Sequence, residues 1–366
     1  MSEVCLYQKI ESDIEGLISS GKISPGEKIP SVSDIRKKYS VSHITALRVL
    51  QELSDSGHVE FVKGKGYFAR ASGKTKNNPA LKGMIACILR PSWKTNPNDN
   101  FFNDINQAVQ NEAMKHKFNL YQPCCNIELL EKIPDEKALD SIKETCIRAS
   151  NDVDGFLLDE RIPDNLLRIL SKEIGKPLVL VGRKSGLDID SVAPDNENGS
   201  AKAAELCIKM GYRFFIVCRN QLSNSNNIER TEAFFNALAN NGISENMVTS
   251  IDFNVLPYED TFAKIKKIMK HGVKTLIFSP NDSFARAVAD LFVEEGTKFG
   301  IETGIMGFEG LGCSKIKKPF ITTVDVKPEL IGTTAVGILA GRINGTNFSR
   351  PGCHVVESEI QLGDTI

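Results

Sequence analysis

Hydroxyl, imidazole and cationic side chains recur at short intervals in residues 42–65 of this sequence. Thr45 and Arg48 are three residues apart, so they share one face if the segment is helical. Short donors and a basic residue on one helix face can bind base edges in the major groove of DNA, and nearby lysines can contact phosphates. The candidate contacts are Ser42, His43, Thr45, Arg48, Lys63 and Lys65. The alternative interpretation is an ordinary solvated helix with surface charges.

A second set of polar and aromatic residues follows apolar runs that have the composition of buried strands. Asp, Asn and Arg are planar hydrogen-bond partners for the neighbouring hydroxyls of a sugar, and an aromatic ring packs on its C–H surface. The candidates are Trp93 and Phe102 after residues 84–89, Arg183 after 178–181, and Asn281 and Asp282 after 275–278. Their recurrence predicts one sugar site, although the Asn-Asp pair fits a helix cap before Ser283 equally well.

Local patterns predict the elements that would position the first set. A helix ending at Gly21 is indicated by apolar residues at three- and four-residue steps: Leu6, Ile10, Ile14, Leu17 and Ile18. Ser31 with Asp34 predicts a capping box that opens a helix to Lys38, and Ser42 opens a longer helix that ends at Gly57. Two strands, 59–62 and 67–69, then flank a basic, glycine-rich tip. The predicted order is three helices and a hairpin.

The remainder of the chain has a different pattern. Residues 71–79 carry no large apolar side chain and suit a connector between domains. Beyond them, helix-like segments separate strand-like runs at 84–89, 119–122, 155–158, 178–181, 214–217, 275–278 and 304–308. This alternation predicts a doubly wound α/β body with parallel sheets, and its length predicts two lobes. Ligands of such sheets bind beyond the carboxyl ends of the strands.

Composition narrows the class of protein. The chain has 45 Lys and Arg against 46 Asp and Glu, whereas residues 1–77 have 12 against 9, so a slight basic excess lies at the N-terminus. The nine cysteines are dispersed without a C-x-x-C pair, which favours buried free thiols over a zinc site or disulfides. No signal peptide and no apolar run long enough for a bilayer is evident. We therefore expect a cytoplasmic protein without membrane contact.

An enzyme is the rival class, because doubly wound folds often carry catalysis. The sequence contains no G-x-S-x-G elbow, phosphate-binding Walker loop or H-E-x-x-H helix, and its five histidines form no local cluster. An aminotransferase-like body would need a Schiff-base lysine at a strand end and a longer chain. We expect no catalytic residue, no metal and no cofactor.

Four spaced motifs resemble the GntR-type winged helix over about residues 5–70: SPGEKIPS from Ser24, VSHITALR from Val41, Leu53-x-x-x-Gly57, and Gly64-Lys-Gly66. This resemblance implies that Ser31 and Thr45 contact phosphates or base edges and that Arg48 contacts a phosphate or guanine. It also implies that Lys65 and Gly66 place the wing in the minor groove. Two positions depart from the family, since Ser33 and His43 stand where arginine is usual.

Further motifs resemble the LacI-type regulatory domain over about residues 82–365. They include Asn100-Phe-Phe, Lys176-Pro-Leu-Val-Leu-Val-Gly-Arg183, Arg230-x-x-x-Phe234, Ser279-Pro-Asn-Asp282, Gly307-Phe-Glu309 and Thr322-Thr-Val324. The resemblance implies an effector site between two lobes. Its expected residues are Trp93 or Phe102 for stacking, Arg183 from the hinge side, Arg230, Asn281 and Asp282 for hydroxyls, and Glu309 in place of the usual Asp.

Together the resemblances imply a sugar-responsive repressor of the arabinose-repressor type. The expected domains are a winged helix-turn-helix over 1–70, a linker over 71–81 and an effector and dimerisation domain over 82–366. Within it, lobe 1 is expected at about 82–193 and 325–353, and lobe 2 at about 194–324 and 354–366. The expected partners are operator DNA, a monosaccharide such as a pentose or deoxyhexose, and a second copy of the chain. The alternatives are a ligand-binding module with lost DNA binding and a regulator of nucleoside or purine metabolism.

Overall fold

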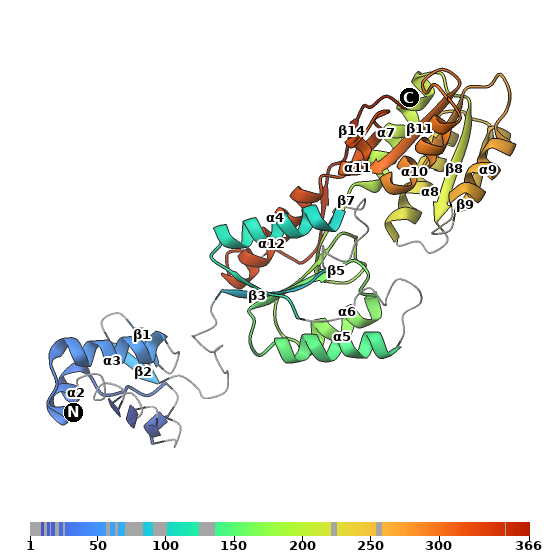
Figure 1. Cartoon of the computed structure of the whole chain (residues 1–366). Helices are drawn as coiled ribbons and strands as arrows, with labels where there is room; N and C mark the ends of the chain where they lie inside the picture. Colours follow the sequence, from blue (N-terminus) through green and yellow to red (C-terminus); the bar gives the residue numbers. More distant parts are fainter. Residues whose placement is uncertain are drawn as a thin grey trace. The chain divides into compact units, whose positions relative to one another are not determined.

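The computed structural model separates the chain into two compact units, Met1–Lys82 and Gly83–Ile366 (Figure 1). The structure describes residues 9–10, 13–14, 16–18, 22–24, 26–55, 59–62, 65–69, 83–90, 101–123, 136–220, 225–253, 258–347 and 349–366. The expected connector at 71–81 and two predicted site residues, Lys63 and Trp93, lie outside these ranges.

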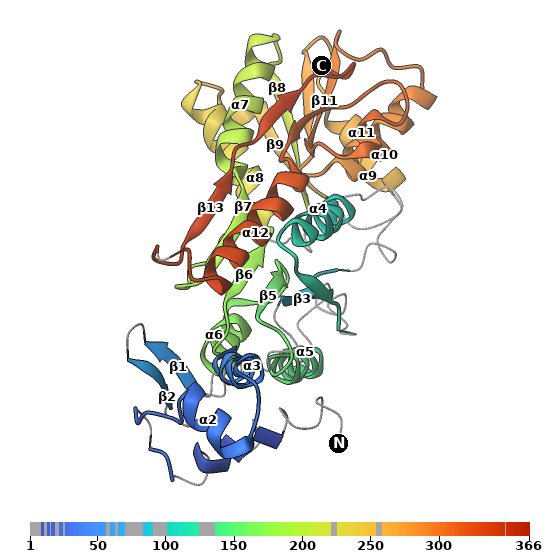
Figure 2. The same ribbon diagram turned by 90° about the vertical axis from the view of Figure 1, so that its left-hand side faces the viewer.

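The small unit follows the predicted order. The described part of residues 9–18 is helical, and it is followed by α2 (Val32–Tyr39), α3 (His43–Asp55), β1 (Val59–Val62) and β2 (Gly66–Ala69). The two strands pair antiparallel, with Val59 opposite Ala69, and the hairpin lies beside α3 (Figure 2). Apolar side chains from each helix fill one core: Ile10, Ile14, Ile35, Val49, Leu50 and Leu53.

The first lobe of the large unit is built on a parallel sheet in the order β13-β7-β6-β5-β3-β4. Its strands are β3 (Met84–Ile88), β4 (Asn119–Tyr121), β5 (Gly155–Asp159), β6 (Leu178–Val181), β7 (Asp190–Pro194) and β13 (Cys353–Val356). The helices are α4 (Phe101–Lys115), α5 (Glu136–Ala149), α6 (Asp164–Glu173) and α12 (Pro328–Ile343). Helices α5 and α6 cover one face, and α4 and α12 cover the other (Figure 1).

The second lobe is built on a sheet in the order β14-β12-β11-β10-β8-β9, in which only β14 is antiparallel. Its strands are β8 (Phe214–Asn220), β9 (Val248–Phe253), β10 (Thr275–Phe278), β11 (Thr303–Glu309), β12 (Thr322–Asp325) and β14 (Glu359–Gln361). The helices are α7 (Asn196–Lys209), α8 (Ser225–Asn240), α9 (Tyr258–Ile268), α10 (Asp282–Glu294) and the short α11 (Gly312–Lys315).

This arrangement confirms the predicted fold class, with two doubly wound sheets of near-continuous apolar strands. The chain passes between the sheets after β7, after β12 and after β13. Residues His354–Val356, which we expected in the second lobe, instead pair with Val192–Pro194 and extend the first sheet. Four of the five described cysteines with free thiols are buried, as expected, and Cys353 is exposed.

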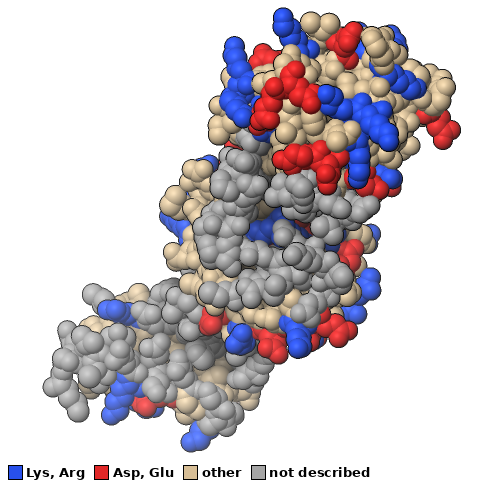
Figure 3. All heavy atoms as spheres, turned by 45° about the vertical axis from the view of Figure 1, so that its right-hand side comes forward, with Lys and Arg blue, Asp and Glu red and all other residues tan. Residues whose placement is uncertain are grey.

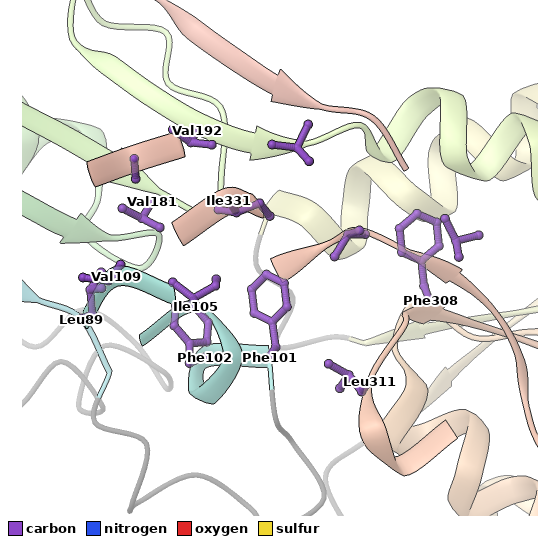
Figure 4. Close-up of a cluster of buried hydrophobic side chains, with 14 of the residues drawn as sticks. Leu89, Phe101, Phe102, Ile105, Val109, Val181, Val192, Phe308, Leu311 and Ile331 are labelled. Carbon is purple, nitrogen blue, oxygen red and sulfur yellow. The ribbon is translucent and has the colours of Figure 1, made fainter. Parts of the chain in front are cut away.

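A hydrophobic core runs continuously from one lobe into the other. Phe101, Phe102 and Ile105 on α4 face Ile331 on α12, and the cluster continues in the second lobe with Phe308 on β11 and Leu311 just after that strand (Figure 4). Helices α4 and α12 pack closely because Gly332 carries no side chain. A Cβ at this position would lie 2.6 Å from the Ile105 carbonyl oxygen.

We expect Gly332→Ala to lower the free energy of unfolding of the large unit by about 1–3 kcal/mol, because the backbone of α4 must move to admit a methyl group. Gly337 is the matched control on the same helix, since a Cβ there meets nothing within 4 Å. Gly337→Ala should raise stability by up to about 1 kcal/mol through helix propensity. Calorimetric melting of both variants checks the pair, and a stabilising Gly332→Ala would contradict the close packing.

Candidate functional site

The N-terminus of α2 is closed by a complete capping box. The Ser31 hydroxyl donates to Asp34 Oδ2 at 2.6 Å and accepts from the Asp34 amide at 3.3 Å, while the Ser31 amide donates to the same carboxylate. These hydrogen bonds from Ser31 lower the pKa of Asp34. The predicted capping box is thus confirmed, and the hydroxyl expected to contact DNA is already engaged within the protein.

Helix α3 carries Thr45 and Arg48 on one face, and Ser42 and His43 stand at its N-terminal end. The Ser42 hydroxyl accepts from the Thr45 amide at 3.1 Å and lies 2.8 Å from the Thr45 hydroxyl, which fixes the first turn of the helix. Side chains of Ser42, His43 and Arg48 are exposed, and Thr45 is half-buried. The opposite face carries Ala46, Val49, Leu50 and Leu53 in the core. Lys65, at the hairpin tip, is also exposed.

In the first lobe, two acidic residues at the end of β5 hold Arg90, which follows β3. The Arg90 Nε donates to Asp159 Oδ2 at 3.2 Å, and Nη2 donates to Glu160 Oε1 at 2.7 Å. Arg90 is 7% exposed, and its guanidinium carbon lies 3.4 Å from the centre of the Phe102 ring. Burial raises the pKa of Glu160, although Arg90 opposes that shift. The ring expected to stack on a sugar is therefore covered by an arginine.

In the second lobe, Arg230 on α8 is 1% exposed and is held by three segments. Its Nε donates to Asn196 Oδ1 at 2.9 Å, and Nη1 donates to the Pro280 carbonyl at 2.8 Å and to Glu309 Oε1 at 3.0 Å. The guanidinium also lies 4.5 Å from the centre of the Phe308 ring. Glu309 has φ +112°, a backbone region that a residue with a side chain adopts only at a cost of about 1–3 kcal/mol. Such strain is typical of ligand clamps.

Asn226 and Asn196 join these two clusters. Asn226 Nδ2 donates across the lobes to Glu160 Oε2 and to the Gly182 carbonyl, both at 2.8 Å. Its Oδ1 accepts from Asn196 Nδ2 at 2.9 Å, and Asn196 Oδ1 accepts from Arg230. We call this chain of side chains the interlobe relay: Arg90, Glu160, Asn226, Asn196, Arg230 and Glu309. In the space-filling view, basic atoms are visible inside a hollow in the middle of the large unit (Figure 3).

Two predicted effector residues, Asn281 and Asp282, make hydrogen bonds that hold the start of α10 in place. Asn281 Oδ1 accepts from the Phe284 amide at 2.9 Å and is the N-cap of α10. Asp282 is fully buried, and its oxygens accept from the Thr323 hydroxyl at 2.6 Å and the Leu311 amide at 2.8 Å. Burial raises the pKa of Asp282 to about 7, because the loss of hydration outweighs these hydrogen bonds. The predicted cap at Asn281 is confirmed, whereas the effector contacts of Asn281 and Asp282 stay predictions.

Arg183 also has a different environment from the one expected. Its Nε donates to the Glu160 carbonyl at 2.7 Å, Nη1 to the Lys184 carbonyl, and Nη2 to the Ile162 carbonyl and Asp164 Oδ1. All three nitrogens are thus bound within the first lobe, so Arg183 supports the loop after β5. Arg90 and Glu160 were missed, although they also follow strands directly and the same rule would have selected them. Asn196 follows β7, a strand that was not among the predicted runs, and Asn226 lies on α8 without such a signal.

Within the described residues, no group of three or more His, Cys, Asp or Glu side chains could hold a metal ion. No helix in the described part of the chain is long and apolar enough to cross a membrane.

The titration of Asp282 gives a pH-dependent prediction. Between about pH 4 and 7 the folded chain keeps a proton that the unfolded carboxyl has released, so this group makes the free energy of unfolding fall as pH rises. Asp282→Asn should flatten that fall by up to about 1.4 kcal/mol per pH unit. If the substitution also weakens the hydrogen bond to Leu311, the free energy of unfolding falls by the same amount at every pH, and its slope against pH does not change. Urea unfolding across this pH range measures the slope, and Asp260→Asn, at an exposed position on α9, is the control. Equal slopes in both variants would refute the raised pKa.

Residues 6–68 match the family model of bacterial regulatory proteins of the gntR family. Residues 85–360 match the model of periplasmic binding proteins and the sugar binding domain of the LacI family.

Similar curated proteins include the HTH-type transcriptional repressor PurR of Aliivibrio fischeri, which is 25% identical. The alignment covers 87% of this chain and 94% of that protein. They also include the HTH-type transcriptional repressor MelR of Bacillus subtilis, 22% identical over 86% of this chain and 91% of its own. Among solved structures, the transcriptional regulator CelR in complex with cellobiose aligns with TM-score 0.63 at 19% identity, over 97% of this chain and 98% of that one.

A ribose-bound LacI family transcriptional regulator from Enterococcus faecium aligns with TM-score 0.62 at 18% identity, over 77% of this chain and 98% of that one. These structural likenesses concern the fold. The match over residues 85–360 spans most of the chain. The chain therefore belongs to the family of periplasmic binding proteins and LacI-type sugar-binding domains, and it carries a gntR-type DNA-binding head in front of that domain.

Proposed function

We propose that this protein is a transcriptional repressor of a carbohydrate-utilisation operon, whose operator binding is controlled by a monosaccharide held between the two lobes of the effector domain. The observation that carries the proposal is the buried Arg230–Glu309 pair, in which a strained acidic residue faces an arginine beside an aromatic ring. Planar hydrogen-bond partners next to a ring suit a sugar. The protein acts on DNA in the cytoplasm, and it is not an enzyme.

The DNA contacts that we propose come from α3 and the wing. Thr45 and Arg48 share one face of α3, Ser42 and His43 are exposed at its N-terminal end, and Lys65 stands at the hairpin tip. With His43 in place of an arginine, base recognition depends chiefly on Thr45 and Arg48. Gly66, at the start of β2, has φ +106°, which lets the wing turn sharply enough to approach a groove.

The effector contacts that we propose keep Arg230 and Glu309, which the sequence predicted, and add Arg90 and Glu160. Glu309 and Arg230 form one wall, and Arg90 with Glu160 forms the other. Each of these two arginines is paired with a carboxylate, so the site has little unbalanced positive charge to attract a phosphate. This balance favours a neutral pentose or deoxyhexose, such as arabinose or fucose, over a phosphorylated sugar.

Linkage between the two sites explains the control that we propose. A sugar that binds one arrangement of the lobes more tightly shifts the protein towards it, and in a homodimer this shift changes the separation of two DNA-binding heads. The two heads of a dimer match the half-sites of a palindromic operator. Effector and operator affinities then change by the same factor.

We expect Arg48→Ala to weaken binding to the DNA upstream of the protein's own gene by at least about tenfold, since a base or phosphate contact is lost. Arg148→Ala, an equal charge change at an exposed position on α5, is the control. Fluorescence anisotropy at several salt concentrations measures both variants. Equal affinities for Arg48→Ala and Arg148→Ala would rule out the proposed α3 contact, and unmeasurable binding by the wild type would favour a module that has lost DNA binding.

A panel of neutral pentoses, deoxyhexoses, sugar phosphates and purine bases tests the effector class by thermal shift. A ligand at 100 times its dissociation constant stabilises the fold by about 2.7 kcal/mol. We expect a neutral monosaccharide to raise the melting temperature and Glu309→Gln to abolish that rise. Glu302→Gln, on the exposed approach to β11, should respond like the wild type. A response to purines alone would overturn the sugar proposal.

A further inference from the structure

Asn226 connects the lobes through polar contacts that no motif of the sequence indicated. Its side chain is 3% exposed and reaches from α8 in the second lobe to two acceptors of the first lobe, Glu160 Oε2 and the Gly182 carbonyl. The side chain's third polar contact, to Asn196, leads to Arg230. One amide is therefore hydrogen-bonded to both walls of the cleft.

Glu160 is the partner on which this connection depends. One of its oxygens accepts from Arg90 and the other from Asn226, so the carboxylate lies between a cation of its own lobe and an amide of the other. Hydrogen bonds to a charged acceptor are about twice as strong as those between neutral groups. Because Glu160 is 6% exposed, water cannot readily replace a lost donor.

The backbone is built to leave room for this contact. Gly182 has φ +105°, and a Cβ there would lie 2.8 Å from Glu160 Oε2. Any larger residue would push the carboxylate away from Asn226. Gly182 thus has two roles, since it leaves the space and also supplies the second acceptor.

We propose that Asn226, with Glu160 and Gly182, is a positioning clasp that holds the two lobes together before any effector binds, and that it aligns Arg90 and Arg230 for the sugar. The alignment of the two arginines rests on the proposed function, whereas the clasp itself does not. The effector then adds to an interlobe contact that already exists, and the strength of the clasp sets how readily the cleft opens for entry.

A second interlobe contact lies at the surface and serves as a comparison. Lys184 of the first lobe lies 3.0 Å from Glu197 and 3.6 Å from Glu229 of the second. Its partners are exposed or half-exposed, and such surface pairs contribute little to stability. The buried clasp should therefore dominate interlobe closure, and Lys184→Ala should have a small effect.

Amide hydrogen exchange of the full-length protein without any ligand tests the clasp. We expect Asn226→Ala to accelerate exchange at least about tenfold in peptides spanning 178–186 and 225–232, with strands β5 and β10 unchanged. Asn198→Ala, an exposed asparagine on α7, is the control and should match the wild type. Gly182→Ala should reproduce the effect of Asn226→Ala without touching that side chain, which keeps the test valid if one variant folds poorly.

Two outcomes would overturn the proposal. In the first, both peptides exchange at the wild-type rate in Asn226→Ala and in Gly182→Ala. In the second, exchange is faster throughout the protein, including β5 and β10, as general destabilisation would produce. Neither outcome depends on the identity of an effector. If hydrogen exchange contradicts the clasp, the proposed repressor function is therefore unaffected. If no sugar binds in the thermal-shift panel, the clasp is unaffected.

Discussion

The burial of one cation, Arg230, constrains the geometry of the whole effector cleft. A guanidinium that is 1% exposed must be matched by acceptors, and removing a partner from a buried pair costs about 3–5 kcal/mol. Its acceptors come from the start of α7, the loop after β10 and the end of β11. These three segments must meet around α8 before any ligand can bind, so the positions of the strand ends follow from the need to satisfy Arg230.

The same constraint extends into the first lobe. Asn196, which satisfies Arg230, also binds Asn226, and Asn226 binds Glu160 and thereby Arg90. The lobes are thus connected by polar contacts along the cleft, while α4 and α12 join them through the apolar core. The DNA-binding head is a separate unit with its own core.

Periodicity and strand composition were enough to predict the fold, because buried parallel strands and amphipathic helices leave strong local signals. The site was predicted less completely, since hydrogen-bond partners are chosen by tertiary structure. Arg183 and Asp282 follow strands as expected, yet both side chains form hydrogen bonds within the protein. Asn196 follows β7, a strand that was not predicted from the sequence, and Asn226 carries no strand-end signal, so only the meeting of α7 and α8 at the lobe boundary shows their role.

If effector and operator binding are linked, as we propose, a complete thermodynamic cycle will show it. Operator affinity is measured with and without the sugar that binds, and sugar affinity is measured with and without operator DNA. We expect both affinities to change by a common factor of about 5–150. If saturating sugar leaves operator affinity unchanged, the effector domain does not control the DNA-binding head.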